Sequence, residues 1–552
     1  MIYSQKELAQ LVIEYCDAYK VQHAIISPGS RNAPLTIGFT NHPNIKTYSI
    51  VDERCAAFFA LGIAQQTRKP VALVCTSGSA LLNYYPAIAE AFYSDIPLIV
   101  ISADRPQHLI DVGDGQAIRQ ENVFKNHSLY NANLIEGKQY LDENIAHVNS
   151  AITAAIEKKG PIHINVPFDE PLYGMTDKLS IKTKLPLKAI KETEQVYTIE
   201  EHIPRWNNSK KKLVLIGSHF PNKKLQNQLL ELVKDESVLV FTETISNIHH
   251  PTFINSIDKL IFPLTEDEFR ILQPDILLTF GGMVVSKKVK QFLRTYKPKE
   301  HWHISDKNAP DTYHSLSHHF KMDDTVFFDE FLDLAKPVSS NYRKFGLALK
   351  KESGEKHNQF LLSTEFSDLK VFEILLESIP NHSQLQLGNS SIIRYSQLFD
   401  INHTLSVFCN RGASGIDGST STAIGASSIV KNQTVFITGD ISFFYDSNAL
   451  WNNYIKKNFR IIIINNSGGG IFRFIPGPSS TNVLDYFETP HHLTAKQLCE
   501  MHTIEYCTAK NEVELKNELN TFYQLENRPK LLEIFTPNTI NDKTLKEYFN
   551  FL

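Results

Sequence analysis

The sequence TGDISFFYD spans residues 438–446, and NNSGGG follows at residues 465–470. Each stretch comes after an apolar run typical of a buried strand. Asp440 and Asn466 should therefore emerge at the carboxyl ends of strands, where open α/β sheets bind their ligands. A carboxylate, an amide oxygen and a backbone carbonyl, here that of Gly468, are hard oxygen ligands that Mg²⁺ combines with phosphate oxygens and water. The pattern predicts a site for Mg²⁺ and a diphosphate.

These two stretches alone also allow a simpler interpretation. An aspartate after a buried strand is often only a loop starter or a helix cap. Gly468 and Gly469 favour the ligand site, because glycines let the backbone approach phosphate groups closely. The rest of the chain must decide between the two interpretations.

Composition describes an ordinary soluble chain of several domains. Its 552 residues are too many for one hydrophobic core. A net charge of -4, with no basic tract beyond residues 210–212, gives no indication of a nucleic-acid partner. Six cysteines form no Cys-x-x-Cys pair, which favours buried thiols in a reducing compartment. No signal core and no membrane-spanning run is evident, so we expect a cytoplasmic protein with no membrane partner.

Apolar runs alternate with helix-like segments along the whole chain, which predicts an α/β fold of three doubly wound parallel-sheet domains. We expect an N-terminal pyrimidine-binding domain (1–182), a central α/β domain (183–350) and a C-terminal diphosphate-binding domain (351–552). Polar stretches at 178–191 and 336–358 are the candidate linkers. The predicted strands are 23–26, 71–75, 97–102, 162–166, 213–216, 238–241, 276–280, 301–304, 384–387, 405–409, 435–438, 461–464 and 531–535.

Asp440 and Asn466, with their spacing, resemble the thiamine diphosphate motif of the decarboxylase and carboligase superfamily. That superfamily also needs a glutamate from a separate domain. The sequence VDERCAAFFALG at residues 51–62 supplies a candidate in Glu53, which precedes an Ala/Phe-rich helix. A purely structural interpretation is that Glu53 is a carboxylate stabilised by the dipole at the N-terminus of that helix.

Further motifs narrow this resemblance: SPGSRNAPLT (27–36), ADRP (103–106) with QAIRQ (116–120), GNSSIIR (388–394) and NRGASGIDG (410–418). With these motifs the chain resembles the 2-succinyl-5-enolpyruvyl-6-hydroxy-3-cyclohexene-1-carboxylate synthase (MenD) family of menaquinone biosynthesis. Ile441 departs from the wider superfamily, where a third glycine is usual, but this family tolerates the change.

The resemblance implies thiamine diphosphate as the cofactor, with Mg²⁺ or alternatively Mn²⁺. Glu53 is implied to hydrogen-bond N1′ of the aminopyrimidine, and Ile416 to be the apolar post under the bent cofactor. An ordinary core isoleucine would look the same in sequence. The implied metal ligands are Asp440, Asn466 and Gly468, and the other cofactor contacts are Ser442, Gly469 and Phe472.

The implied substrates, 2-oxoglutarate and isochorismate, carry two carboxylates each, which guanidinium groups can bind bidentately. Arg31 and Gln116 are predicted to act in catalysis with Glu53. Arg119 is a weaker candidate, and lysine tandems such as that at Lys287 are usually solvated. The predicted substrate contacts are Ser30, Arg31, Arg105, Gln116, Lys287, Ser390, Arg394 and Arg411.

The resemblance therefore implies a transferase of the transketolase/transaldolase type. It would decarboxylate 2-oxoglutarate and add the succinyl carbanion to isochorismate. Because the glutamate reaches the cofactor from the neighbouring subunit in this superfamily, we expect a homodimer, or a homotetramer built as a dimer of dimers. Two alternatives remain: another thiamine diphosphate-dependent 2-oxo acid decarboxylase or carboligase, and a non-enzymatic nucleotide- or phosphate-binding protein.

Overall fold

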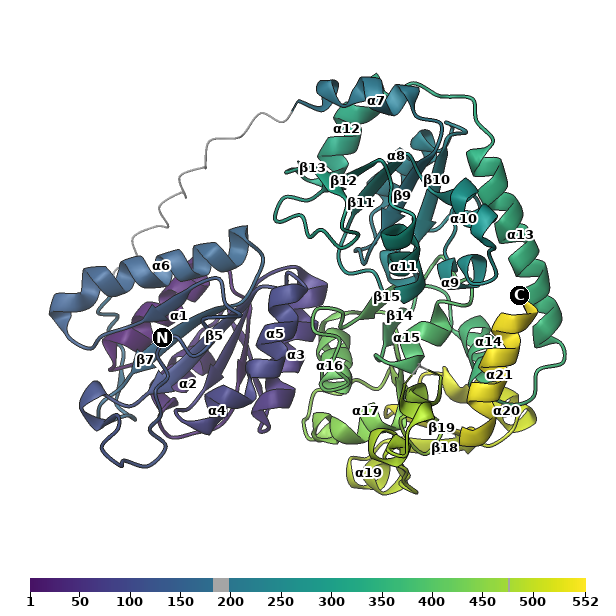
Figure 1. Cartoon of the computed structure of the whole chain (residues 1–552). Helices are drawn as coiled ribbons and strands as arrows, with labels where there is room; N and C mark the ends of the chain where they lie inside the picture. The colour runs from purple at the N-terminus through teal and green to yellow at the C-terminus, as the bar shows by residue number, and fades with distance from the viewer. Residues whose placement is uncertain (182–197, 475–476) are drawn as a thin grey trace.

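The computed structural model describes residues 1–181, 198–474 and 477–552. Three parallel sheets, each covered by helices, follow one another along the chain (Figure 1). The predicted α/β class with three parallel-sheet domains is confirmed. A short antiparallel pair, β1 (Tyr3–Ser4) and β8 (Met175–Thr176), joins the two ends of the first domain.

The N-terminal sheet has the strand order β3-β2-β4-β5-β7-β6, and all its neighbours are parallel. Its strands are β2 (His23–Ile26), β3 (Lys46–Ser49), β4 (Val71–Cys75), β5 (Leu98–Asp104), β6 (Asn131–Asn133) and β7 (Ile162–Pro167). Its helices are α1 (Glu7–Ala18), α2 (Ala33–Asn41), α3 (Glu53–Thr67), α4 (Ser79–Asn83), α5 (Tyr85–Tyr93) and α6 (Leu141–Glu157).

The C-terminal sheet has the order β15-β14-β16-β17-β19-β18, which repeats the arrangement of the N-terminal sheet strand for strand. Its strands are β14 (Gln384–Leu387), β15 (Ser406–Cys409), β16 (Thr434–Gly439), β17 (Phe459–Asn465), β18 (Glu505–Ala509) and β19 (Lys530–Phe535). Its helices are α14 (Asp368–Ser378), α15 (Ser391–Ser396), α16 (Ser419–Ile429), α17 (Asp440–Tyr445), α18 (Leu484–Glu488), α19 (Lys496–Met501), α20 (Glu512–Phe522) and α21 (Asn538–Phe551).

The middle sheet, of order β10-β9-β11-β12-β13, is also parallel throughout. Its strands are β9 (Lys212–Ile216), β10 (Val238–Thr242), β11 (Ile276–Phe280), β12 (Glu300–Ile304) and β13 (Leu316–Phe320). Its helices are α7 (Ile203–Asn208), α8 (Lys223–Leu232), α9 (Ile257–Ile261), α10 (Glu266–Leu272), α11 (Lys287–Thr295) and α12 (Asp324–Leu334).

Helices α3 and α16 join the N-terminal and C-terminal domains at unusually short range. A Cβ atom on Gly62 would lie 2.1 Å from the backbone oxygen of Thr422, and one on Gly425 would lie 2.1 Å from that of Phe59. The glycines therefore let the two helix backbones touch. One apolar core continues across this contact, from the side chains of α3 to those of α16 and α17.

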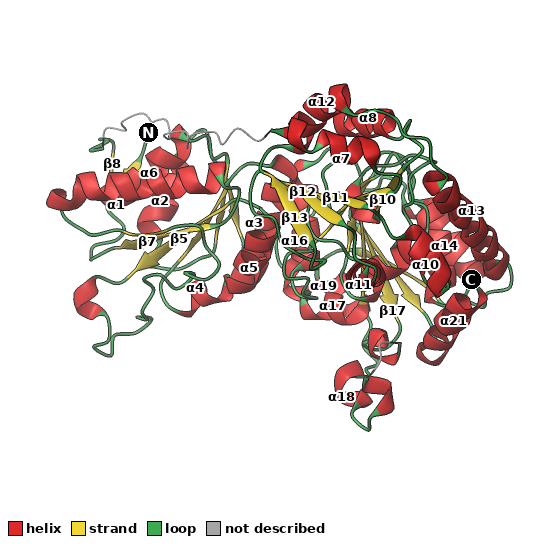
Figure 2. Cartoon of the chain, turned by 45° about the horizontal axis from the view of Figure 1, so that its top comes forward, coloured by secondary structure: helices red, strands yellow, loops and turns green. Residues whose placement is uncertain are grey.

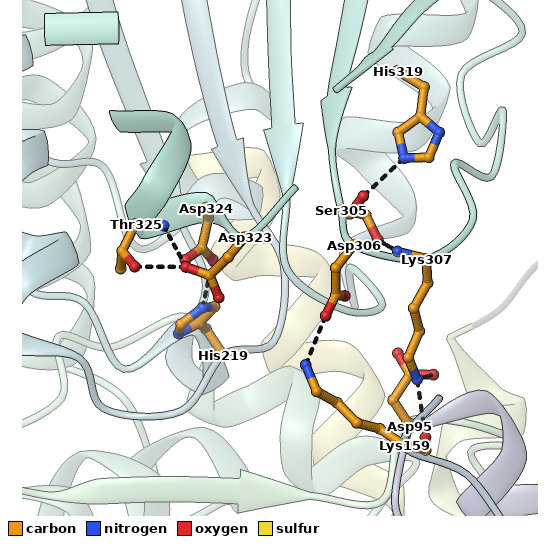
Figure 3. A network of polar contacts seen from close by, with 10 residues as sticks. All are labelled: Asp95, Lys159, His219, Ser305, Asp306, Lys307, His319, Asp323, Asp324 and Thr325. Atoms are coloured by element: carbon orange, nitrogen blue, oxygen red, sulfur yellow. Dashed lines mark hydrogen bonds and ion pairs between the residues drawn. The ribbon is translucent and has the colours of Figure 1, made fainter. Parts of the chain in front are cut away.

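Charged contacts between the N-terminal and middle domains are more exposed. Figure 3 shows Lys159 beside Asp306 and Lys307 beside Asp95. The Lys159–Asp306 pair is 2.8 Å long, and both side chains are nearly half-exposed. Exposed pairs contribute only about 0–1 kcal/mol each. The shared core at α3 and α16 is therefore the stronger connection of the N-terminal domain to the rest of the chain.

Most of the candidate linker at residues 336–358 is helical. Residues 342–361 form helix α13 (Tyr342–Leu361), which packs on β10, α9 and α21 along one side of the molecule (Figure 1). Lysine, glutamate and leucine are good helix formers, and this helix needs only a narrow apolar stripe. The other candidate linker, at residues 178–191, lies outside the described residues from residue 182 onward. The domain boundaries at 182 and 350 stay predictions.

All the predicted strands lie within strands of the structure or overlap them. Six strands were missed, and four of them, β3, β6, β13 and β18, lie at the edges of the large sheets. All six cysteines are unpaired, and four of them are buried, as predicted. Within the described ranges, no helix combines the length and the apolar character needed to cross a bilayer.

Buried histidines should make the fold sensitive to acid. Burial lowers the pKa of His163 and of His357 to about 3, and that of His301 and of His303 to about 4, from an ordinary value of 6.5. Below about pH 6.5 the unfolded chain binds protons that the folded chain excludes. The free energy of unfolding should therefore fall as pH falls, by about 1.4 kcal/mol per pH unit for each such histidine.

Urea denaturation at pH 7 and pH 5 would measure this slope. His163→Gln removes one titrating group but retains a hydrogen-bonding group toward Ser102, which lies 2.7 Å from His163 Nε2. We expect a shallower pH dependence in the variant. Equal slopes for the variant and the unaltered chain would contradict the assignment.

Candidate active site

Asp440 and the glycine turn after β17 lie together at the carboxyl edge of the C-terminal sheet. Asp440 is buried at the start of α17, directly after β16, and β16 pairs with β17. Its Oδ1 accepts a hydrogen bond from the backbone N–H of Ile441 (2.7 Å), and its Oδ2 accepts one from the N–H of Gly468 (3.0 Å). The two sequence stretches quoted first are thus in direct contact.

Asn466 supplies the observation that best fits a bound cation. Its Nδ2 donates to Asp368 Oδ2 at 3.0 Å, whereas its Oδ1 is buried and has no hydrogen-bond partner. Buried polar atoms are rarely left unsatisfied, and each exception needs an explanation. A carboxylate and an amide oxygen at the ends of two paired strands suit Mg²⁺. No cluster of three or more His, Cys, Asp or Glu that could hold a metal occurs in the described part of the chain.

The glycine turn itself is held by Glu488. Gly468 has φ +152°, and a Cβ on it would lie 2.7 Å from the backbone oxygen of Glu488. The N–H of Gly469 donates to that same oxygen at 2.7 Å. The buried carboxylate of Glu488 in turn pairs with Arg473, whose Nη2 donates at 2.7 Å. Only glycine therefore fits this close approach of the backbone.

Two aromatic side chains lie beside this turn. Phe472 packs against Phe487, with ring centroids 5.3 Å apart. Phe487 belongs to α18, which projects from the domain (Figure 2) and exposes Tyr486. Phe472 also lies against Gly469, and its contact with the cofactor stays a prediction.

Ser442 and Ile416 are also brought together. Ser442, one turn into α17, donates from Oγ to the backbone oxygen of Ile416 at 2.6 Å. This bond ties α17 to the loop between β15 and α16. Ile416 is half-buried in that loop.

The predicted arginines of the C-terminal domain are neighbours. Arg411 donates from Nη1 to Asn389 Oδ1 at 2.8 Å. The next residue along the chain, Ser390, precedes α15 and has φ +65°. Burial lowers the pKa of Arg394, and repulsion from Arg411 lowers it further. The Nε atoms of both arginines are buried without a hydrogen-bond partner. Lys287 begins α11 in the middle domain and is exposed.

The predicted residues of the N-terminal domain gather at the carboxyl ends of β2 and β5. Arg31 is buried and donates to the backbone oxygen of Phe168 (2.9 Å), and Ser30 before it is exposed. Arg105 donates to the backbone oxygen of Gly115 at 2.7 Å, next to Gln116.

Arg31, Gln116 and Arg119 make further contacts within the N-terminal domain. Arg31 also pairs with Glu170 at 3.2 Å. Gln116 has φ +56°, and its backbone lies against Gly78. Arg119 is 83% exposed and pairs with Asp111, so the structure places it on the surface.

Glu53 lies where the N-terminal domain meets the C-terminal domain. It begins α3, and the residues on either side of it are held by the C-terminal domain. Asp52 accepts from Asn448 Nδ2 at 2.8 Å, and Arg54 donates to the backbone oxygen of Tyr445 at 2.9 Å. Among the described residues, no hydrogen bond or ion pair connects the predicted N-terminal site residues with those of the C-terminal domain.

Sequence reasoning missed His491, whose Nε2 lies 3.3 Å from Asp440 Oδ2. The two groups form an ion pair whose geometry is not that of a hydrogen bond. The Asp440 carboxylate raises the pKa of His491. No sequence signal marked this histidine, since it lies in an irregular segment after α18.

Glu90 in α5 was also missed. Its buried carboxylate accepts hydrogen bonds from the backbone N–H groups of Gly412 (2.6 Å), Ala413 (2.7 Å) and Ser414 (3.1 Å), and from Ser94 Oγ (2.7 Å). The loop that carries Arg411 and Ile416 is thus fixed by the N-terminal domain of the same chain. An isolated glutamate on a helix gives no sign of such a contact in sequence.

Comparison with known proteins agrees with this geometry. Residues 6–128 match the thiamine pyrophosphate enzyme N-terminal TPP binding domain, and residues 181–387 match the middle domain of thiamine pyrophosphate enzymes. The chain is 56% identical to the 2-succinyl-5-enolpyruvyl-6-hydroxy-3-cyclohexene-1-carboxylate synthase of Flavobacterium psychrophilum, over the full length of both. It belongs to this synthase family.

Other members of the synthase family also match over all of this chain. The synthase of Flavobacterium johnsoniae is 55% identical over all of both chains. That of Porphyromonas gingivalis is 37% identical over all of this chain and 98% of its own. The predicted family, and with it a thiamine diphosphate enzyme of the transketolase type, is confirmed.

Glu90→Gln tests the contact between α5 and the 412–414 loop. A glutamine has one acceptor oxygen where the carboxylate has two, so at least one buried N–H loses its partner. We expect the free energy of unfolding to fall by about 1–3 kcal/mol. Urea denaturation would measure it. Ser94→Ala, which removes a single donor to the same carboxylate, should cost less, and an equal or larger loss in that control would contradict the interpretation.

Proposed function

We propose that this chain decarboxylates 2-oxoglutarate and adds the succinyl unit to isochorismate, giving 2-succinyl-5-enolpyruvyl-6-hydroxy-3-cyclohexene-1-carboxylate and CO₂ in menaquinone biosynthesis. The single observation that carries the proposal is the buried, unpartnered Oδ1 of Asn466 at the strand end next to that of Asp440. This oxygen has no role in the fold of the chain alone. A cation held with a diphosphate gives it one.

The residues that would hold the cofactor are those of the C-terminal strand ends. Asp440, Asn466 Oδ1 and the backbone carbonyl of Gly468 would bind Mg²⁺, or alternatively Mn²⁺, and the glycine turn would admit the diphosphate. Thiamine diphosphate, when bound, supplies a centre that stabilises a carbanion. Ser442 would keep α17, and so Asp440, in register with the loop of Ile416.

Glu53 would hydrogen-bond N1′ of the aminopyrimidine and share a proton there. We propose that it does so in a homodimer, where each site combines one chain's cation ligands with Glu53 of the partner subunit. The support is that, among the described residues, no hydrogen bond or ion pair joins Glu53 to Asp440, Asn466 or Gly468, whose contacts lie within the C-terminal domain. Closed two-fold symmetry would complete two sites at once, and a dimer of dimers would preserve them. The cytoplasmic location stays a prediction.

The arginines would bind the substrate carboxylates. Arg31, Arg394 and Arg411 each have a buried Nε without a hydrogen-bond partner, and Arg105 Nε has only the Asp114 carboxylate at 3.3 Å. Guanidinium groups with free donors suit the bidentate binding of carboxylates. Four such groups match substrates that carry two carboxylates each. This set favours the synthase reaction over that of a decarboxylase acting on a simple 2-oxo acid.

The cation ligands are tested by Asp440→Ala. Without its carboxylate the diphosphate and the cation lose their shared ligand, and we expect thiamine diphosphate binding to be abolished. Calorimetric titration of the cofactor with Mg²⁺ would measure this. Asp329→Ala, at a half-exposed aspartate paired with Lys224 in the middle domain, is the matched control and should bind normally. Normal binding by Asp440→Ala would remove Asp440 from the site.

We expect substitutions of different arginines to affect the two substrates differently. Truncating one partner of a desolvated charge pair costs about 2–5 kcal/mol, which is roughly 30-fold or more in binding. Arg31→Ala should weaken isochorismate more than 2-oxoglutarate. Arg394→Ala should retain cofactor binding and lose turnover. Steady-state kinetics would show this, with the exposed Arg205→Ala as control. Unchanged constants in both site variants would favour a different carboligase.

A further inference from the structure

Asp368 is a buried carboxylate directly behind Asn466. It is the first residue of α14 and only 2% exposed. Its Oδ2 accepts from Asn466 Nδ2 at 3.0 Å, and its Oδ1 accepts from Thr536 Oγ1 at 2.6 Å. Its own backbone N–H donates to Asn541 Oδ1 at 2.8 Å. Two segments distant in sequence, at Asn466 and at Thr536–Asn541, thus hold this residue in one position.

The contact decides which end of the Asn466 amide faces the cation site. An amide has one end that donates and one that accepts, and an ionised carboxylate can only accept. Asp368 therefore takes the NH₂ group, and the Oδ1 of Asn466 points the other way, where it is buried without a partner. The opposite orientation would set two oxygens against each other and turn an NH₂ group toward a cation.

We propose that Asp368 is a positioning residue that fixes the amide of Asn466 with its oxygen toward the divalent cation. This inference rests on the proposed function, since it assigns Asn466 as a ligand. Groups that orient a ligand from behind typically change metal affinity by 10- to 100-fold when they are altered. The Asp368 side chain need not touch the cation to have this effect.

The informative variant is Asp368→Asn. Thr536 Oγ1 should continue to donate to the remaining oxygen of residue 368, so the new NH₂ group would face Asn466. Asn466 must then present its own oxygen to that group and turn its NH₂ group to the site. We expect the dissociation constant of Mn²⁺, measured by electron paramagnetic resonance on the full-length protein with thiamine diphosphate present, to rise by about 10- to 100-fold.

Thr536→Val is the matched control. It removes a hydrogen bond to the same carboxylate, through the other oxygen, and leaves the Asn466 contact in place. We expect it to lower the melting temperature without weakening Mn²⁺ binding. If both variants weaken Mn²⁺ binding equally, Asp368 matters only for stability, and the inference is overturned.

An exchanged pair keeps the test decisive if the single variant folds poorly. Asp368→Asn combined with Asn466→Asp conserves charge and size, and a carboxylate at 466 presents oxygen in either orientation. We expect this pair to recover most of the Mn²⁺ affinity lost in Asp368→Asn. Failure to recover it in a folded pair would contradict the positioning role.

Asn466→Ala separates failure of this inference from failure of the proposed function. Mn²⁺ affinity unchanged by Asn466→Ala would remove Asn466 from the cation site, and the proposed site would fall together with the inference. Weakened binding in Asn466→Ala with unchanged binding in Asp368→Asn would leave the site intact and overturn the inference alone.

Discussion

The backbone contact between α3 and α16 is the constraint on which the rest of the arrangement depends. Gly62 and Gly425 let the two helices meet without intervening side chains, and a single apolar core continues through them. The N-terminal domain is thereby fixed on the C-terminal one. Glu53 starts α3, so its position follows from this packing and from the contacts of its neighbours with residues 445–448. Side chains larger than hydrogen at these glycines would force the domains apart.

The candidate site combines buried polar groups whose bonds are complete with others that lack a partner. Glu90 and Glu488 have their carboxylates fully engaged with donors of the chain. Asn466 Oδ1 and the Nε atoms of Arg394 and Arg411 are buried without partners. Each unsatisfied group costs about 1–3 kcal/mol, a large fraction of the 5–15 kcal/mol by which a domain is stable. Bound cation and carboxylates would remove that cost, which couples binding to stability.

The sequence predicted every central strand of the large sheets and two of the six edge strands, β10 and β15. Strands covered on both faces are continuous apolar runs, as at residues 276–280 and 461–464, and such runs are easily recognised. Strands β6, β13 and β18 are short or half-exposed, so polar residues interrupt them. The polar helix α13 was taken for a linker for a related reason, because a helix that buries one narrow stripe resembles a polar segment in a single sequence.

The same distinction holds within the candidate site. Asp440, Asn466, Arg105 and Arg411 come within two residues of a strand end, and Arg31 and Arg394 follow a strand by a few residues more, where local sequence reveals them. Asp368, Glu90 and His491 act across the fold, at sequence separations that no local pattern records. Asp368 contacts a residue 98 positions away, and Glu90 holds a loop 322 positions away. The sequence could therefore indicate which atoms meet the ligands, whereas the groups that orient those atoms became visible only when the sheets were assembled.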